Sequence, residues 1–272
     1  MSSRDTRRSK KFGVSWAGCD VIEMYLGMFA GGWAIDGRTQ AWLAHDDPVS
    51  ALQSWAAKIE SEYATRWRKV SVTLWLSGGL ARPFLCGPVA GLANWDEAEA
   101  MAAAMAPEAT GFDVPCRVRL EDWPGDAVAL GTAIDGAVAQ AVAEVARVRR
   151  LVWRSVRPRW AGLLDEALLQ HASASLVGCV EEDALTLLGG PAHAQGVAGG
   201  GFELAATYSP APSVERSAAL WNRTMLSRDV RPDDAWFARL EMPVPDLGRP
   251  AIDPGARRSW PLAVRQSESV LP

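Results

Sequence analysis

The chain has 272 residues, of which 49% are hydrophobic and 22% are charged, and its formal net charge is −4. This length and composition are typical of a soluble globular protein with room for a sizeable core. The acidic balance argues against nucleic-acid binding, and no run approaches the roughly 20 apolar residues needed to cross a bilayer. We therefore expect a cytoplasmic protein that does not itself insert into a membrane.

The N-terminal third predicts a basic leader, two hairpins and a helix. Residues 1–11 are polar and basic and lack the apolar segment of a secretory signal, so we expect a disordered leader. Residues 12–26 are interpreted as two short strands joined by a turn at residues 17–20. Asp36-Gly37 indicates a second hairpin turn, and Asp47-Pro48 indicates the start of a helix.

Strands and helices then alternate along the middle of the chain. Ser77-Gly78-Gly79 predicts a turn between strands, because the GxSxG frame of a nucleophile elbow is absent. Asn94 is a typical helix N-cap. The predicted strands cover residues 69–76, 80–86, 116–123, 127–134 and 151–156, and the predicted helices begin near residues 94, 135 and 160. This alternation predicts an α/β fold with mixed sheets flanked by helices.

The last third repeats the same theme in a shorter form. The predicted strands cover residues 175–188, 202–208 and 236–242, and one helix covers residues 214–226. The glycine-rich segment 189–201 lacks the GxxxxGK[ST] pattern, and no lysine follows Lys69, so we interpret it as a hairpin tip and not as a phosphate loop. Glu181, Glu182 and Asp183 suit a hairpin turn. From residue 243 to residue 272 we expect a Pro-rich extended tail.

Three segments resemble the actin-like superfamily, specifically the pilus-assembly protein PilM and the cytoplasmic part of the type II secretion protein GspL. They are the opening run 12–26, the strand–helix–strand region 127–158 and the run 175–188. The resemblance implies duplicated RNase H-like subdomains, the first covering residues 12–150 and a shortened second one covering residues 151–242.

The resemblance also implies a nucleotide site, which departs from the family pattern. The family's first phosphate hairpin alternates apolar residues with Gly, Asp and Gly, but this chain has Ser15 at the Asp position and Ala17 at the second Gly position. A serine brings no negative charge to a magnesium ion. Gly178 lies where the second hairpin would carry an acidic residue. We therefore expect a vestigial nucleotide site at Ser15, Ala17, Gly18 and Gly178, with no cofactor, no metal and no catalysis.

The alternative is an active ATP-binding enzyme of the actin-like or sugar-kinase class. Such an enzyme would bind ATP with Mg²⁺ and would need a carboxylate near the γ-phosphate. Asp20 and Asp36 are the N-terminal candidates, although turn preference is the simpler explanation of Asp20.

A basic stretch suggests where a partner would bind. Six arginines between residues 147 and 159 alternate with apolar residues, and arginine offers forked donors to carboxylates. The other interpretation is a solvated strand face beside a helix C-terminus, where basic residues suit the helix dipole. For the first interpretation we predict Trp153, Arg154, Arg157 and Trp160 as anchors.

The resemblance implies that the partner is a cytoplasmic segment of an inner-membrane pilus or secretion protein, or the assembly ATPase. The function predicted from sequence is therefore that of a non-catalytic cytoplasmic adaptor.

Overall fold

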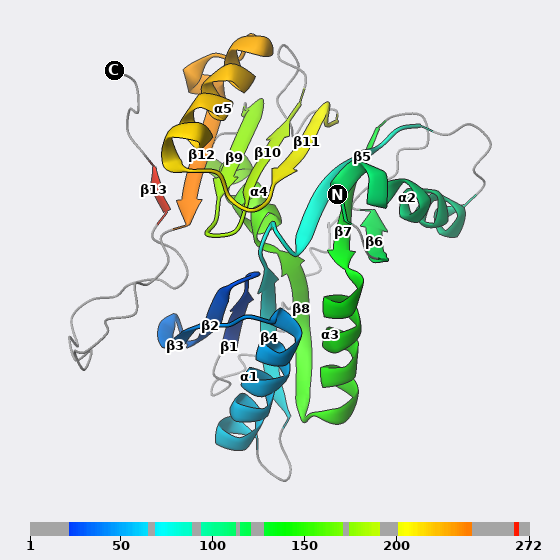
Figure 1. Ribbon diagram of the computed structural model, residues 1–272, viewed down its shortest axis with the longest axis vertical. Coiled ribbons are helices and arrows are strands. Elements are labelled where there is room, and N and C mark those ends of the chain that lie inside the picture. The colour runs from blue at the N-terminus through cyan, green and yellow to red at the C-terminus, as the bar shows by residue number, and fades with distance from the viewer. Residues whose placement is uncertain are drawn as a thin grey trace, which may run out of the picture.

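The structure is a computed structural model, and it describes residues 22–64, 69–88, 94–112, 115–120, 128–170, 174–190, 201–240 and 264–266. These residues form two lobes, each built on a five-stranded sheet, and a three-stranded sheet that lies beside the second lobe. Figure 1 shows the second lobe at the top, the first lobe at the bottom and the small sheet on the right.

The first sheet has the order β3-β2-β1-β4-β8. Its strands are β1 (Ile22–Leu26), β2 (Ala30–Ile35), β3 (Arg38–Ala44), β4 (Val70–Leu76) and β8 (Leu151–Pro158). The first three form antiparallel pairs, whereas β4 and β8 run parallel to β1. Asp36 and Gly37 have φ values of 47° and 75°, the positive φ that a two-residue hairpin turn requires. The predicted turn at this position is confirmed.

Two helices cover one face of the first sheet and bury its core. They are α1 (Pro48–Tyr63) and α3 (Gly136–Val148). Leu52, Trp55 and Ile59 on α1 are buried against the sheet, as their helical spacing predicts. The Asp47 carboxylate accepts the amide N–H groups of Val49 and Ser50, which confirms the predicted helix start.

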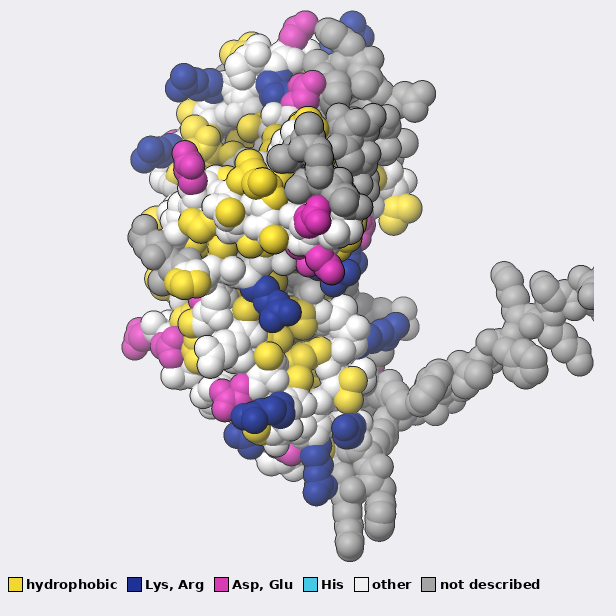
Figure 2. Space-filling model, turned by 90° about the vertical axis from the view of Figure 1, so that its right-hand side faces the viewer, with side chains coloured by type: hydrophobic (Ala, Val, Ile, Leu, Met, Phe, Trp, Pro, Cys, Tyr) yellow, Lys and Arg dark blue, Asp and Glu magenta, His cyan; other side chains and the backbone are white. Residues whose placement is uncertain are grey.

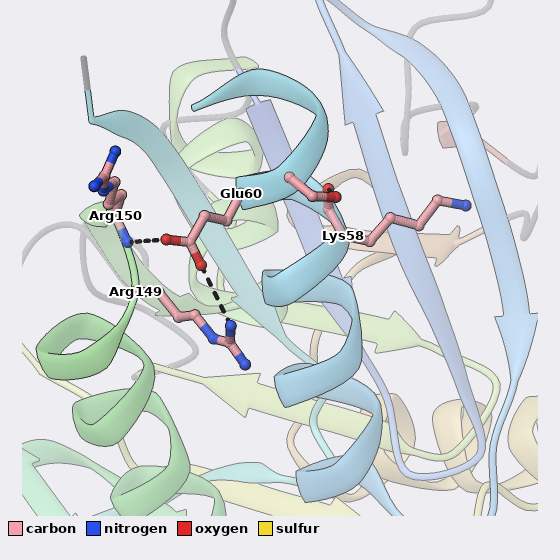
Figure 3. A network of polar contacts seen from close by, with 5 residues as sticks. Lys58, Glu60, Arg149 and Arg150 are labelled. Atoms are coloured by element: carbon pink, nitrogen blue, oxygen red, sulfur yellow. Dashed lines mark hydrogen bonds and ion pairs between the residues drawn. The ribbon is translucent and has the colours of Figure 1, made fainter. Parts of the chain in front are cut away.

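The end of α1 is tied to the end of α3 by one carboxylate (Figure 3). Glu60 Oε1 accepts the backbone N–H of Arg150 at 3.0 Å, and its Oε2 lies 3.4 Å from the guanidinium of Arg149. Lys58 points to the other side of α1, where its ammonium group lies 5.3 Å from the centre of the Trp33 ring. Part of the basic stretch therefore serves contacts within the first lobe.

The small sheet has the order β5-β7-β6 and is covered by one helix. The elements are β5 (Ala81–Cys86), β6 (Cys116–Leu120), β7 (Ala129–Asp135) and α2 (Trp95–Thr110). Asn94 caps α2 by accepting the N–H of Glu97, as the sequence predicts. The buried face of α2 carries Ala98, Ala102 and Ala106, and such small side chains let the helix lie close to the strands.

The second lobe repeats the strand order of the first. Its sheet is β11-β10-β9-β12-β13, with β9 (Leu176–Val180), β10 (Leu185–Gly189), β11 (Leu204–Tyr208), β12 (Ala235–Leu240) and β13 (Val264–Gln266). As in the first lobe, the first three strands are antiparallel and the fourth is parallel to the first. The fifth strand differs, because β13 has three residues and runs antiparallel. The duplication with a reduced second half is confirmed.

Three helical elements accompany the second sheet. They are α4 (Arg159–Gln170), α5 (Val214–Ser227) and the short 3₁₀ helix η2 (Pro232–Asp234). Trp160 and Leu163 of α4 are buried in a core shared with Val177 of β9 and Trp236 of β12. Helix α4 therefore connects the last strand of the first sheet to the core of the second lobe.

One predicted boundary needs correction. Strand β8 was placed at the start of the second subdomain, but it pairs in parallel with β4, so the first sheet extends to Pro158. The hairpin predicted over residues 12–26 lies mostly outside the described residues, and its last five residues form β1, which pairs with β2. Of the predicted leader and tail, residues 1–11 lie outside the described residues, and the tail is described only at β13.

Candidate functional site

Three turns meet where the two lobes join. The first connects β1 to β2 at residues 27–29, and the second connects β4 to β5 at residues 77–80. Since β1 and β4 are parallel neighbours, both turns follow strand ends at the same edge of the first sheet. The third turn connects β9 to β10 in the second lobe and carries Glu181, Glu182 and Asp183. This acidic turn, residues 181–184, makes four hydrogen bonds to the first lobe.

Glu181 is bound by the first lobe through both carboxylate oxygens. The Tyr25 hydroxyl lies 3.0 Å from Oε1, and the backbone N–H of Gly78 donates to Oε2 at 2.7 Å. Glu181 is 3% exposed and Tyr25 is 1% exposed. The contact therefore lies in the interior, shielded from solvent.

Asp183 makes the second contact between the lobes. Its Oδ2 accepts the backbone N–H of Met28 at 2.7 Å and the hydroxyl of Ser77 at 2.5 Å. Asp183 is also buried, and its Oδ1 has no hydrogen-bond partner among the described residues. The first lobe thus supplies two amide and two hydroxyl donors to the two carboxyl groups of one turn.

Burial raises the pKa of both acids. Removal from water, together with the neighbouring Asp183 charge, raises the pKa of Glu181 to about 8. Burial also raises the pKa of Asp183, but the donors Ser77 and Met28 act in the opposite direction. At neutral pH the Glu181 carboxyl therefore holds a proton, so that the pair avoids two adjacent negative charges.

A buried cation lies beside the acidic turn. Arg159, the first residue of α4, is 3% exposed, and its guanidinium carbon lies 5.3 Å from the centre of the Trp75 ring. Its Nε and Nη2 atoms have no hydrogen-bond partner within the described segments. Its positive charge acts to lower the pKa of Glu181, against the larger effect of burial.

The glycines of the β4–β5 turn are required by this close fit. A Cβ on Gly78 would lie 2.6 Å from Thr186 Oγ1 and 3.0 Å from Glu181 Oε2. A Cβ on Gly79 would lie 2.8 Å from Met28 Sδ and 2.9 Å from Asp183 Oδ2. The Ser77-Gly78-Gly79 turn predicted from sequence is confirmed, and its contact with the acidic turn is an additional finding.

Of the four predicted nucleotide-site residues, the structure describes only Gly178. Ser15, Ala17 and Gly18 lie outside the described residues. Gly178 lies within β9, where an added Cβ would be 2.6 Å from the Phe237 ring and 2.7 Å from the Trp221 ring. Aromatic packing accounts for this glycine. Residues 191–200 of the glycine-rich segment are also outside the described part of the chain.

The structure corrects one of the four predicted partner anchors, Trp160. Trp160 is 1% exposed and donates its indole N–H to the carbonyl of Ala81 at 2.7 Å, so it is a core residue. Trp153 is partly buried and donates to the carbonyl of Val142 at 2.9 Å. Arg157 pairs with Asp165 at 2.7 Å near the surface. Arg154 is exposed at the bulge between β8 and β4.

A groove beside α3 offers a second surface for binding. Its volume is about 290 Å³, and its lining is apolar except for one arginine. The lining residues are Leu76, Arg117, Ile134, Ala139, Val142, Ala143 and Val156. Arg117 on β6 is exposed and forms no ion pair with a described residue. Figure 2 shows this side of the molecule, where hydrophobic side chains gather between basic ones.

The described residues offer neither a metal site nor a membrane span. No group of His, Cys, Asp and Glu among them is placed to hold a metal ion. Among the helices of the described segments, none has the length and apolar character needed to cross a bilayer.

Comparison with known proteins identifies the fold. No protein-family model matches the sequence, and no curated protein matches it. The structure is similar to a Bacteroides thetaiotaomicron VPI-5482 protein of actin-like ATPase fold and unknown function. The two have 10% identity and a TM-score of 0.54, over 84% of this chain and 83% of that chain. The chain therefore has an actin-like fold.

Two further solved structures show weaker similarity. One is the cytoplasmic domain of EpsL, an inner-membrane component of the Vibrio cholerae type II secretion system. The similarity covers 87% of this chain and 90% of that chain, with 12% identity and a TM-score of 0.45. The other is the PilM-PilN type IV pilus biogenesis complex, with 14% identity over 78% of this chain and 66% of that chain and a TM-score of 0.45.

Proposed function

We propose that this protein is a non-catalytic adaptor of actin-like fold in a pilus-assembly or type II secretion-like machine. It would bind a cytoplasmic segment of an inner-membrane protein, or the assembly ATPase. The observation that carries the non-catalytic part is the occupied junction, where Glu181 and Asp183 take the donors of the first lobe. The sequence resemblance to PilM and GspL motivates the choice of machine.

The occupied junction disfavours nucleotide binding for two reasons. A nucleotide bound between the turns of the two lobes would need donors for its phosphates, but there the amide N–H groups of Met28 and Gly78 already donate to carboxylates. A phosphate placed there would also meet the buried Asp183 carboxylate, and like charges repel strongly away from water. Binding of ATP would therefore require the acidic turn to leave the first lobe.

The groove beside α3 supports the binding part of the proposal. Its lining buries apolar side chains of a partner segment, and Arg117 at its side pairs with a partner carboxylate. Val156 lines the groove from β8, whereas the adjacent Arg157 is paired with Trp75, whose side chain is on the opposite face of the sheet. We therefore assign the apolar contacts to the groove and keep only Arg154, which is exposed, as a secondary contact for an acidic partner.

The non-catalytic part is tested by titrating the purified protein with ATP and Mg²⁺ in a calorimeter. We expect no heat at millimolar nucleotide and no rise in the melting temperature, because a ligand that binds only the native state must stabilise it. Magnesium-dependent binding would contradict the proposal and favour an ATP-binding enzyme of the actin-like or sugar-kinase class.

The binding part is tested by co-purification with detergent-solubilised membranes, followed by mass spectrometry. Ala143→Glu places a charge in the groove. Because Ala143 is at an exposed position of α3, the variant protein should keep its fold. Ala137→Glu is the matched control, since Ala137 is exposed on the same helix but does not line the groove. We expect an inner-membrane protein to be retained by the wild type and the control and lost by Ala143→Glu. Equal retention by all three would exclude the groove.

A further inference from the structure

We propose that Glu181 and Asp183 form a proton-dependent clasp, which holds the two lobes together while Glu181 is neutral and loosens when Glu181 ionises. The clasp joins one turn of the second lobe to two turns of the first through four hydrogen bonds of 2.5–3.0 Å. This inference concerns the relative position of the lobes and is independent of the adaptor function.

The groups around Glu181 make the stability of the junction depend on whether Glu181 is charged. The titratable and charged groups around it are Asp183 on its own turn, Tyr25 on β1, Cys179 on β9 and Arg159 on α4. Arg82 on β5 faces Asp183. Glu181 is buried, so water does not screen its repulsion from Asp183.

The hydrogen bonds of Glu181 accommodate a neutral carboxyl group. Oε2 accepts the N–H of Gly78, so the proton of the neutral form belongs on Oε1. There it points to the Tyr25 oxygen 3.0 Å away, which can act as acceptor as well as donor. Asp183 differs, because one of its oxygens accepts two donors, the pattern expected of a carboxylate.

Ionisation of Glu181 leaves the pair no way to relax in place. The two carboxylates would then repel each other across one turn, and Arg159 makes no ion pair with either of them in the described structure. The glycine turn is packed closely against both acids, so neither can withdraw within the closed junction. Moving the acidic turn out of the first lobe is the remaining way to return the charges to water.

The test compares wild type with Glu181→Gln, which imitates the neutral carboxyl group, between pH 5 and pH 9.5. The folded protein binds a proton at Glu181 up to about pH 8, whereas the unfolded chain releases it near its ordinary pKa of 4.5. Stability must therefore fall as pH rises through this window. We expect the unfolding equilibrium constant of the wild type to rise, relative to the variant, up to about tenfold per pH unit.

Lobe separation is measured on the same samples by small-angle X-ray scattering. We expect the radius of gyration of the wild type to increase above about pH 8, while that of Glu181→Gln stays constant. Glu182→Gln is the matched control, because Glu182 is in the same turn but makes none of the four bonds. Its radius of gyration should increase above about pH 8 as that of the wild type does.

Two results would overturn the clasp. One is a finding that the stability of wild type and of Glu181→Gln depends on pH in the same way, because protonation of Glu181 would then not be linked to folding. The other is a radius of gyration that stays constant in the wild type at pH 9.5. If Glu181→Gln does not fold, Asp183→Asn tests the same point, because it removes the opposing charge and should likewise keep the lobes closed at high pH.

Discussion

The Ser77 hydroxyl donates a hydrogen bond of 2.5 Å to the Asp183 carboxylate, although 106 positions separate the two residues in the sequence. Both are buried, Ser77 in the turn after β4 and Asp183 in the turn after β9. The bond therefore joins corresponding edges of two sheets that have the same strand order. It is the shortest of the four bonds between the lobes at this junction.

Removing this donor should destabilise the protein. Ser77→Ala leaves Asp183 with one donor in a buried site, and the loss of a hydrogen bond to a charged group costs about 1.5–3 kcal/mol. Urea denaturation measures the change. Ser61→Ala is the control, since its hydroxyl bonds to a carbonyl of its own exposed helix turn, and it should change stability by less than about 0.5 kcal/mol. Equal effects for both variants would show that the Ser77 bond contributes little.

Tyr25→Phe should move the titration of Glu181. The Tyr25 hydroxyl stabilises the ionised form by donating to Oε1 and thereby acts to lower the pKa of Glu181. Without it, that pKa should rise above its present value of about 8. The measurement compares Tyr25→Phe with the Tyr25→Phe/Glu181→Gln double variant over a range of pH. The midpoint of their stability difference should lie at higher pH than the midpoint found for wild type against Glu181→Gln. A shift to lower pH would show that the hydroxyl stabilises neutral Glu181, as an acceptor, more than it stabilises the ionised form.

Arg159→Met removes the buried cation beside the junction. Because the Arg159 charge lowers the pKa of Glu181, the midpoint should again move to higher pH. Two guanidinium nitrogens have no partner in the described structure, so the loss at pH 6 should be small, below about 1 kcal/mol. A loss above about 3 kcal/mol, the cost of breaking a buried ion pair, would show that Arg159 has a partner.

Two substitutions of Glu60 separate its two contacts (Figure 3). Glu60→Gln keeps an acceptor for the Arg150 N–H but removes the charge opposite Arg149. The Arg149 side chain is 38% exposed, so this change should cost less than about 1 kcal/mol. Glu60→Ala loses both contacts and should cost about 1 kcal/mol more. If the two variants are equally stable in urea, the bond to the backbone of Arg150 makes no net contribution.

Gly79→Ala tests how closely the turns fit. The added Cβ would lie 2.8 Å from Met28 Sδ and 2.9 Å from Asp183 Oδ2, so the junction must shift. Overpacking of this kind costs about 1–3 kcal/mol. Gly87→Ala is the matched control, because nothing lies within 4 Å of its added Cβ. A fully stable Gly79→Ala protein would show that the junction adapts more easily than its geometry indicates.

Local chemistry explains which features could be predicted from the sequence. The Asp36-Gly37 turn and the caps at Asp47 and Asn94 depend on contacts within a few residues, and the structure has all three. The actin-like fold followed from the order of such elements. These features need no knowledge of distant parts of the chain.

The misplaced elements depend on distant contacts or unusual turns. Gly27-Met28-Phe29 forms the turn between β1 and β2 without the polar residues that typically mark one. Strand β8 belongs to the first sheet because of its pairing with β4, more than 70 positions earlier. Trp160 looked like a surface anchor beside arginines, but its amphipathic helix turns it into the core.

The candidate site was missed for the same reason. Glu181 and Asp183 at alternate positions are common in turns, and Ser77-Gly78 is an ordinary end for a strand. Their pairing becomes visible only when both sheets are formed. The one available signal was the concentration of three acids in an otherwise apolar run between β9 and β10.

The junction has a kinetic consequence. Its four bonds join residues that are 103, 106, 155 and 156 positions apart, so each closes a very long loop. The strands within each sheet pair mostly with nearer partners and can form earlier. We therefore expect the junction to be unformed in the folding transition state, with φ-values near zero for Ser77→Ala and Gly79→Ala. Such variants would leave the refolding rate unchanged and speed up unfolding, which shortens the lifetime of the native state.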